Sequence, residues 1–199
     1  MKLGILGGTF DPIHLGHLAA ASAALDCAEL ERVLFIPSAR PPHRPAAHAS
    51  AEARLAMCRL AVAGEPRFEV SDLEVRRGGP SYTSDTLREL RLARPDDELH
   101  LILGWDAAKL FRSWHEPEAV LELVMIVVVA RPGTAEPSAA DLRSAGFDPG
   151  RVISCLRVTP DVSGSELRRE LAAGASISGQ VSPAVEGYIA EHDLYRDNR

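Results

Sequence analysis

The sequence contains only three cysteines, and their positions exclude a metal site of the usual kind. Cys27, Cys58 and Cys155 are far apart, form no Cys-x-x-Cys pair, and each lies among apolar residues. Cysteine ligands of zinc come in closely spaced pairs, whereas isolated cysteines among apolar residues are typical of reduced, buried thiols. We therefore expect mostly buried thiols and no zinc centre.

Two further absences exclude whole classes of partner. The 22 basic residues are outnumbered by 28 acidic ones, which gives a formal charge of −6, so the basic face of a nucleic-acid-binding protein is not expected. The longest apolar run, Val120–Ala130, contains Glu122 and is too short to cross a bilayer. Met1–Leu6 is too short for a signal peptide. We expect a cytoplasmic protein with no nucleic-acid or membrane partner.

The remaining composition is that of an ordinary globular protein. Of the 199 residues, 46% are hydrophobic and 25% are charged, which is sufficient for one sizeable core. No repeat, low-complexity segment or interdomain linker interrupts the chain. We predict a single domain over residues 1–199 with a small C-terminal helical part at about 160–199, present as a monomer or small homo-oligomer.

Apolar runs of strand length alternate with segments of helical period. The predicted strands are Lys2–Leu6, Val33–Ile36, Phe68–Val70, Leu99–Leu103, Met125–Val129 and Val152–Cys155. The predicted helices are Leu15–Ala28, Ala51–Ala63, Thr83–Ala93, Pro117–Leu123, Ser165–Ala173 and Pro183–His192. Proline and glycine predict loops or turns at Ser38–Ser50, Arg76–Ser81 and Arg131–Ser138. This alternation indicates an α/β fold with a Rossmann-like, doubly wound parallel sheet, whose ligands lie at the carboxyl ends of the strands.

The first strand and the first helix are joined by Gly7–His17, GGTFDPIHLGH. Its glycine pair allows a sharp turn close to a ligand, and the free N–H groups at the start of the following helix suit a phosphate. His14 and His17 share one face of the first helical turn, where imidazoles can stabilise charge that develops on phosphate. Gly16 keeps that face open for a nucleotide ring. Surface histidines beside a plain turn are the ordinary alternative.

This segment resembles the signature of the nucleotidyltransferase superfamily that carries an HxGH motif. Within it, the chain resembles the bacterial nicotinate-nucleotide adenylyltransferases, which make deamido-NAD and pyrophosphate from nicotinate mononucleotide and ATP in NAD biosynthesis. The resemblance runs nearly end to end and implies the same activity and the same two substrates. It implies catalytic roles for His14, His17 and Arg168, and ATP or phosphate contacts from Gly7, Gly8, Thr9, Phe10, Gly16, Arg44, Asp106, Ser163 and Ser165.

Two segments resemble the acceptor side of the family's site. In the block Ser81-Tyr82-Thr83, backbone groups around Tyr82 and Thr83 are implied to hold the nicotinate carboxylate. The alternative is that Thr83 or Ser84 simply caps a helix. Trp114 matches the tryptophan that stacks on the pyridine ring, although a core position is the ordinary alternative. The adjacent His115 stands where relatives often carry an aromatic residue.

Further segments resemble the ATP side. Pro41-Pro42-His43-Arg44 resembles a loop whose basic residue reaches a substrate phosphate, with arginine in place of lysine; a mobile surface loop is the alternative. Asp106 follows a central strand, where a carboxylate suits ribose hydroxyls or a helix N-cap. Asp161–Arg168 resembles a phosphate-gripping helix start, but Gly164 and Ser165 depart from the family's residues, and Ser165 is also a plausible N-cap.

The remaining segments and the cofactor complete the resemblance. The closing segment with Leu194-Tyr195 resembles the family's final helix, which we interpret as structural. The implied reaction is attack of a mononucleotide phosphate on the α-phosphorus of ATP, which needs no general base because the phosphate is already an anion. Mg²⁺ is expected to bridge the phosphates, held mainly by substrate oxygens and water, with no protein-built metal site.

Four other functions remain open at this point. Two change only the acceptor, to nicotinamide mononucleotide or pantetheine phosphate. A third is a fragment of an aminoacyl-tRNA synthetase, for which the chain is short and acidic. The fourth is a nucleotide sensor without activity, since a fold by itself never proves a function. The presence of both motif histidines and Arg168 favours an enzyme.

Overall fold

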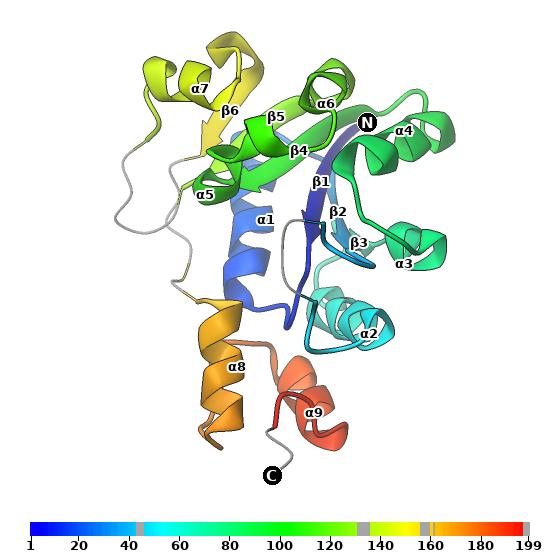
Figure 1. Ribbon diagram of the computed structural model, residues 1–199, viewed down its shortest axis with the longest axis vertical. Coiled ribbons are helices and arrows are strands. Elements are labelled where there is room, and N and C mark those ends of the chain that lie inside the picture. The colour runs from blue at the N-terminus through cyan, green and yellow to red at the C-terminus, as the bar shows by residue number, and fades with distance from the viewer. Residues whose placement is uncertain (43–45, 131–135, 156–159, 161, 197–199) are drawn as a thin grey trace.

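The computed structural model describes residues 1–42, 46–130, 136–155, 160 and 162–196 (Figure 1). The strands are β1 (Lys2–Gly8), β2 (Arg32–Pro37), β3 (Phe68–Val70), β4 (Glu98–Gly104), β5 (Met125–Val129) and β6 (Val152–Cys155). The longer helices are α1 (Leu15–Cys27), α2 (Ala51–Val62), α4 (Thr83–Ala93), α8 (Gly164–Ala172) and α9 (Pro183–Glu191). The shorter ones are α3 (Leu73–Arg77), α5 (Trp105–Ala108), α6 (Pro117–Leu123) and α7 (Ala139–Ala145), with 3-10 turns η1 (Phe111–Ser113) and η2 (Pro149–Arg151).

All six strands form one parallel sheet in the order β3-β2-β1-β4-β5-β6. At its centre, Gly4 of β1 lies opposite Val33 of β2 on one side and His100 of β4 on the other. The chain first winds from β1 toward β3 and then returns to β4, so the direction of winding reverses between β1 and β4. Such a reversal leaves a crevice at the carboxyl ends of the two strands. The predicted doubly wound fold is confirmed.

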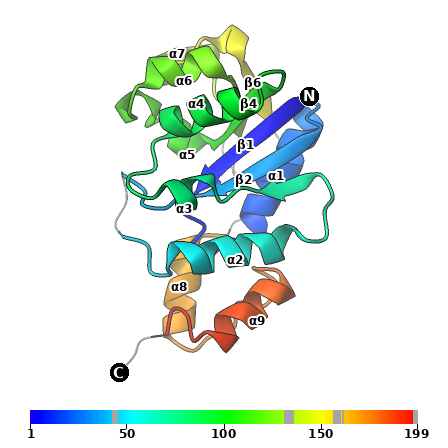
Figure 2. The ribbon, with the colours of Figure 1, turned by 90° about the vertical axis from the view of Figure 1, so that its right-hand side faces the viewer.

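Successive residues of each strand point to opposite faces of the sheet and build two separate apolar clusters. On one face, Val33 and Phe35 pack with residues of α1 and α2; on the other, Leu34 and Ile36 pack with α4 and α6. Figures 1 and 2 show these helices as layers on either side of the sheet, with α8 and α9 next to α2 at one end of the molecule. Apolar residues of α8 and α9 join the first cluster: Leu167, Val185 and Ile189. We interpret the chain as one domain for this reason.

Three short helices were not predicted from the sequence. α3 occupies part of the predicted turn Arg76–Ser81, and α5 and α7 lie in segments for which no element was predicted. α7 is stabilised locally, because the Ser138 hydroxyl accepts from the Asp141 N–H at 3.2 Å and Asp141 accepts in return from the Ser138 N–H at 2.9 Å. Helices of one or two turns give only a weak apolar period, which left these three unrecognised, whereas α6, of the same length as α7, was predicted.

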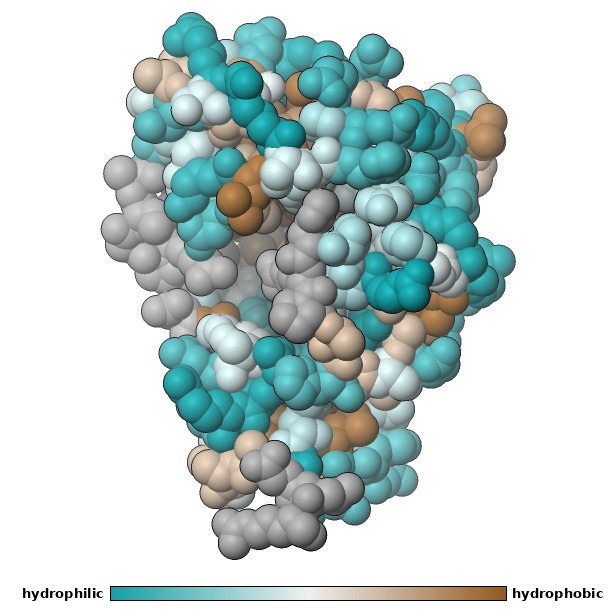
Figure 3. Space-filling model, in the orientation of Figure 1, coloured by the Kyte–Doolittle hydropathy of each residue, from teal (hydrophilic) through white to brown (hydrophobic). Residues whose placement is uncertain are grey.

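The hydropathy of the surface and the burial of the cysteines match what the composition predicted. The face in Figure 3 is mainly hydrophilic, with hydrophobic residues scattered singly over it. Within the described ranges, no helix is both long and apolar enough to span a bilayer. None of the three cysteines forms a disulfide among the described residues, and Cys58 and Cys155 are buried as expected. The cytoplasmic location and the oligomeric state remain predictions.

A buried carboxyl joins α3 to α4. Glu74 is 6% exposed and accepts a hydrogen bond from the Thr86 hydroxyl at 2.6 Å, and Thr86 in turn accepts one from Arg77 Nη2 at 3.0 Å. Burial raises the pKa of the Glu74 carboxyl above its ordinary value of 4.5, although the hydroxyls of Thr86 and Ser81 and the charge of Arg77 lower it. The folded protein therefore holds a proton at Glu74 in a pH range where the unfolded chain has lost it.

We expect Glu74→Gln to change how stability depends on pH. Because the pKa of Glu74 is raised in the folded state, its contribution to stability is complete below pH 4.5 and is lost as the pH rises through the folded-state value. The variant should thus gain stability relative to the wild type as the pH rises from 4.5 to 8. Thermal unfolding across this range measures the difference. The exposed Glu122→Gln on α6 is the control, and the same difference in Tm at every pH would contradict the prediction.

Candidate active site

The Gly7–His17 segment lies at the crevice between β1 and β4. The Ser38 N–H donates to the Gly8 carbonyl at 2.9 Å, which joins the ends of β1 and β2. A Cβ added at Gly7 or at Gly104 would meet no described atom within 4 Å, so the space beside both strand ends is open. A Cβ at Gly8 would instead come within 3.0 Å of the Phe10 ring. The loop can approach a ligand at Gly7 and is tightly packed one residue later.

The buried side chain of Phe10 anchors this loop in the core. Its backbone is in the left-handed region at φ 49°, which a bulky side chain rarely adopts, and the residue is 2% exposed. Its ring and that of His17 form a T-shaped pair with a centroid distance of 4.9 Å, and the Phe10 ring lies 6.0 Å from that of Phe35. Since the ring is buried, any contact of Phe10 with a phosphate must come from its backbone.

The two motif histidines lie against each other. Their rings stack at a centroid distance of 3.7 Å and an angle of 27°, and the His14 N–H donates to His17 Nδ1 at 3.2 Å. His14 is 8% exposed, whereas His17 is partly exposed. The structure therefore brings together the pair that the sequence indicated, with His17 as the more accessible member.

The expectation that Gly16 keeps this face open is wrong, and one of the amides at the start of α1 is not free. The Leu15 N–H donates to the Gln180 carbonyl at 2.9 Å, so the first amide of α1 is already engaged by the protein. A Cβ at Gly16 would lie 3.0 Å from His14 Nδ1 and 3.3 Å from the Pro160 carbonyl oxygen, so Gly16 permits close packing and does not keep an open face. The Leu15 amide is therefore not available to a phosphate at this turn.

The start of α8 lies beside the motif loop. Arg168 Nη1 donates to the Asp11 carbonyl at 2.6 Å, and a Cβ at Gly164 would be 3.5 Å from the same oxygen. Ser163 occupies the N-cap of α8, and its hydroxyl pairs with that of Ser165 at 2.8 Å. The alternative of Ser165 as N-cap is thus wrong. Three predicted residues, Ser163, Ser165 and Arg168, gather at one helix end next to the loop.

Asp11 is the centre of this arrangement, and the sequence did not identify it as a site residue. Its carboxylate is almost fully buried and accepts from the His48 N–H at 2.7 Å, the Ala49 N–H at 3.0 Å and the Tyr195 hydroxyl at 2.8 Å. Asp11 therefore ties the motif loop to the segment before α2 and to the end of the chain. Tyr195, which we expected to be structural, also contacts the motif, because its hydroxyl donates to the Asp11 carboxylate.

Arg54 of α2 holds the same loop from the other side. It is 1% exposed, and its guanidinium donates to the carbonyls of Thr9 at 2.7 Å, Ala39 at 3.1 Å and Ala49 at 3.2 Å. Burial lowers the pKa of Arg54, while the negative charge of Asp11 opposes this. The sequence carried no signal for Arg54, because an arginine in an amphipathic helix usually faces solvent.

The predicted acceptor residues lie at the start of α4. Tyr82 occupies its N-cap and Thr83 is its first residue, so neither Thr83 nor Ser84 caps the helix as the alternative supposed. The Tyr82 ring lies 4.2 Å from that of His115. Trp114 is half-buried, with its ring 5.4 Å from Phe111. Trp114 directly precedes His115 in the chain, and the ring of His115 contacts Tyr82.

The last two predicted residues have different outcomes. Asp106 lies in the first turn of α5 and pairs with Lys109 at 2.8 Å; Gly104 is the N-cap, so the capping alternative for Asp106 is wrong. Arg44 lies outside the described residues. The place of Asp106, directly after the carboxyl end of β4, is on the side of the crevice opposite the motif loop.

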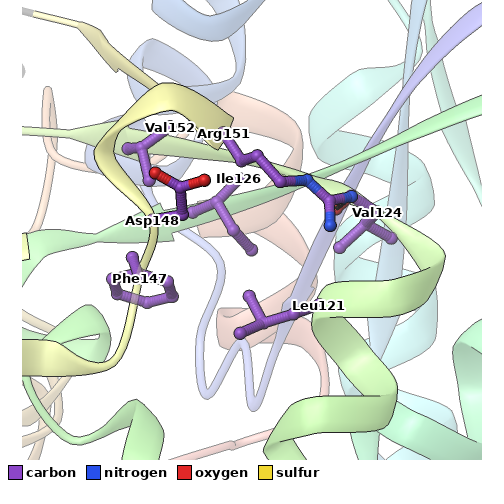
Figure 4. Close-up of a pocket in the computed structure, with 7 residues that line it drawn as sticks. All are labelled: Leu121, Val124, Ile126, Phe147, Asp148, Arg151 and Val152. Atoms are coloured by element: carbon purple, nitrogen blue, oxygen red, sulfur yellow. Dashed lines mark hydrogen bonds between the residues drawn. The ribbon is translucent and has the colours of Figure 1, made fainter. Parts of the chain in front are cut away.

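A small pocket elsewhere does not belong to this site. It is lined by Leu121, Val124, Ile126, Phe147, Asp148, Arg151 and Val152. Figure 4 shows Leu121 and Ile126 pointing toward one another across it. Val124, Ile126 and Val152 lie at the amino ends of β5 and β6, away from the edge where the motif residues gather. Ligands of doubly wound sheets bind at the opposite edge, so we assign it no substrate.

The chain is similar to known proteins in sequence and in fold. The sequence profile of the cytidylyltransferase-like family matches residues 5–170. A Thermus thermophilus protein named "Probable nicotinate-nucleotide adenylyltransferase" is 48% identical over 98% of this chain and 100% of its own length. A Citrifermentans bemidjiense protein of the same name is 45% identical over the whole of both chains. The solved structure of Plasmodium falciparum nicotinic acid mononucleotide adenylyltransferase complexed with NaAD has a TM-score of 0.79 at 19% identity, covering 98% of this chain and 97% of that one, and so shares the fold.

We expect Arg54→Met to destabilise the protein strongly. The substitution keeps the volume but leaves three buried carbonyls without their donor, which should cost about 3–5 kcal/mol in the free energy of unfolding. The free energy of unfolding of Arg54→Lys should lie between those of the wild type and Arg54→Met, since an ammonium group cannot reproduce the planar fork of a guanidinium. Denaturant unfolding measures both. The control in the same helix is Arg59→Met, whose exposed pair with Asp72 at 3.6 Å should contribute less than about 1 kcal/mol; equal losses at both sites would refute the prediction.

We expect Tyr195→Phe to lower kcat several-fold while the protein stays folded. The variant removes one of three donors to the Asp11 carboxylate, which costs about 1–2 kcal/mol, and it loosens the loop that holds Arg168. Because burial raises the pKa of the Tyr195 phenol, its hydroxyl stays protonated throughout the assay range. The control is Tyr188→Phe on α9, whose ring stacks on His192 at 3.9 Å. A loss of stability without any change in kcat would show that the bond is only structural.

Proposed function

The chain belongs to the cytidylyltransferase-like family and, within it, to the nicotinate-nucleotide adenylyltransferases, and from this premise we propose how its residues carry out the reaction. The enzyme transfers the adenylyl group of ATP to nicotinate mononucleotide, giving deamido-NAD and pyrophosphate in NAD biosynthesis. The observation that carries the assignment of residues is the bond from Arg168 of α8 to the carbonyl of Asp11, in the same motif segment as the stacked His14–His17 pair.

Adenylyl transfer requires that the protein position the two substrates and stabilise the charge of the transition state. An oxygen of the nicotinate mononucleotide phosphate forms a bond to the α-phosphorus of ATP, and the bond from that phosphorus to the bridging oxygen of the β-phosphate breaks. Pyrophosphate leaves with the electron pair. The attacking oxygen is already anionic at neutral pH, so no proton has to be removed by a protein base. The protein must bring the groups into line and stabilise the negative charge on the transferring phosphorus.

On the ATP side, the accessible His17 donates to phosphate oxygens, and His14 holds it through the stacked ring and the backbone bond to Nδ1. Arg168 and the serines at the start of α8 contact the phosphates from the side opposite the histidines. Gly7, Gly8 and Thr9 border the phosphates with their backbone, and Asp106 faces the ribose from the end of β4. Arg44 supplies a further cation from the loop after β2.

On the acceptor side, the N–H groups at the start of α4 bind the carboxylate of nicotinate, because the positive end of a helix dipole favours an anion. The positions of Tyr82 at the N-cap and Thr83 after it support this role. Trp114 provides a flat face for the pyridine ring, as the half-buried indole remains partly accessible beside η1.

Mg²⁺ fits this site as a companion of the substrate. Among the described residues, no group of three histidines, cysteines or carboxylates is placed to hold a metal ion. Asp11 is engaged by three donors and Asp106 by Lys109, so neither is set up as a ligand. An ion that prefers phosphate oxygens and water needs no such cage. When bound, it neutralises charge on the triphosphate.

The direct test is His17→Ala, assayed by pyrophosphate release from ATP and nicotinate mononucleotide. We expect kcat to fall by about 10²–10³-fold, the usual effect of removing one donor to developing charge, with the fold unchanged. His192→Ala on α9 is the matched control and should retain full activity. Undiminished release by the His17 variant would refute the role of His17. Binding of ATP without turnover of any mononucleotide by the wild type would favour a sensor.

A further inference from the structure

A second pocket lies between the loop that follows β2 and the turn that precedes α4. It is lined by Arg40, Pro41, Pro42, Ala46, Pro80 and Tyr82. Its walls are three prolines, an alanine and a tyrosine ring, with a single charged side chain among them. The pocket therefore offers flat apolar surfaces and one cation to whatever enters beside the start of α4.

The backbone fixes Arg40 relative to Tyr82. The Ala39 N–H donates to the Ser81 hydroxyl at 2.9 Å, the Ser81 N–H donates to the Arg40 carbonyl at 2.9 Å, and Arg40 pairs with Pro80 in a parallel bridge. These bonds join the residues on each side of the pocket. The Arg40 side chain takes part in none of them, so it can be changed without breaking the link.

The charge of Arg40 is not compensated within the described part of the chain. No described carboxylate lies within 4.0 Å of its guanidinium, whereas Arg76, Arg77 and Arg88 on the neighbouring helices α3 and α4 all have carboxylate partners. Asp85, in the first turn of α4, is itself paired with Arg88 at 3.4 Å. Glu116, beside His115, is paired with Arg88 at 2.6 Å. Arg40 is therefore an exposed cation at this pocket whose charge no described carboxylate balances.

We infer that Arg40 is a specificity-determining residue that pairs with the carboxylate of the acceptor's pyridine ring. This inference rests on the proposed function, because it places the acceptor's base beside Tyr82. The carboxylate would then lie between the guanidinium and the positive end of α4, beside Tyr82. A planar guanidinium can donate two parallel hydrogen bonds to a carboxylate. A neutral amide has no negative charge and only one oxygen to accept them. Arg40 thus favours the acid over the amide.

The test compares two acceptors that differ only in this group. Calorimetric binding of nicotinate mononucleotide and nicotinamide mononucleotide is measured for the wild type, Arg40→Ala and Arg40→Lys, with and without a non-hydrolysable ATP analogue. We expect Arg40→Ala to weaken binding of the acid about tenfold and that of the amide less than about twofold. Arg40→Lys should lie between, and Arg76→Ala, which removes another exposed arginine, should change neither.

Each outcome has a meaning. Equal weakening for both acceptors would overturn the inference in favour of a contact to the phosphate that they share, and no weakening for either would overturn it outright. A selective loss for the acid supports it even if the wild type proves unable to release pyrophosphate, in which case only the proposed reaction fails. Failure of the wild type to bind either acceptor would refute the proposed function and this inference together. An unchanged Tm for Arg40→Ala confirms that the fold is intact.

Discussion

The loop between β1 and α1 depends on two buried ionic groups, the guanidinium of Arg54 and the carboxylate of Asp11. A loop pressed against a sheet edge carries backbone groups that water cannot reach, and each of them must find a partner in the protein. Arg54 supplies donors to carbonyls from two different loops, and Asp11 supplies acceptors to N–H groups from one of them and to the last turn of the chain. Through this pair, four separate segments take up one arrangement.

That arrangement suits the reaction. Transfer of an adenylyl group between phosphates involves little proton chemistry, so the rate depends on how well the groups that meet the phosphates are held before the substrates arrive. The Asp11 carbonyl accepts from Arg168, and the His17 ring packs against the rings of His14 and Phe10. Each group that is proposed to act on ATP is therefore fixed by a neighbour that does not act on it.

The acceptor side is built differently. Apart from Trp114, its residues come from the loop after β2 and from the start of α4, and these two segments are joined through Ser81. Few of its side chains are fully buried. A site of this kind relies on flat surfaces and on local positive charge to choose its ligand, whereas the ATP side relies on rigidity. The crevice between β1 and β4 lies between the two sides.

Much of this protein follows from the sequence by itself. Strands buried on both faces appear as short continuous apolar runs, and all six were found because this signal is local; the Gly7–His17 segment was found for the same reason. The N-caps of α4, α5 and α8 were not: they are Tyr82, Gly104 and Ser163, because neighbouring residues compete for the cap and packing decides between them. The tertiary structure alone decided that Arg54 is buried. It also alone brought Tyr195 and Arg168 to Asp11, across 184 and 157 residues of chain, since no local pattern records a contact over such a separation.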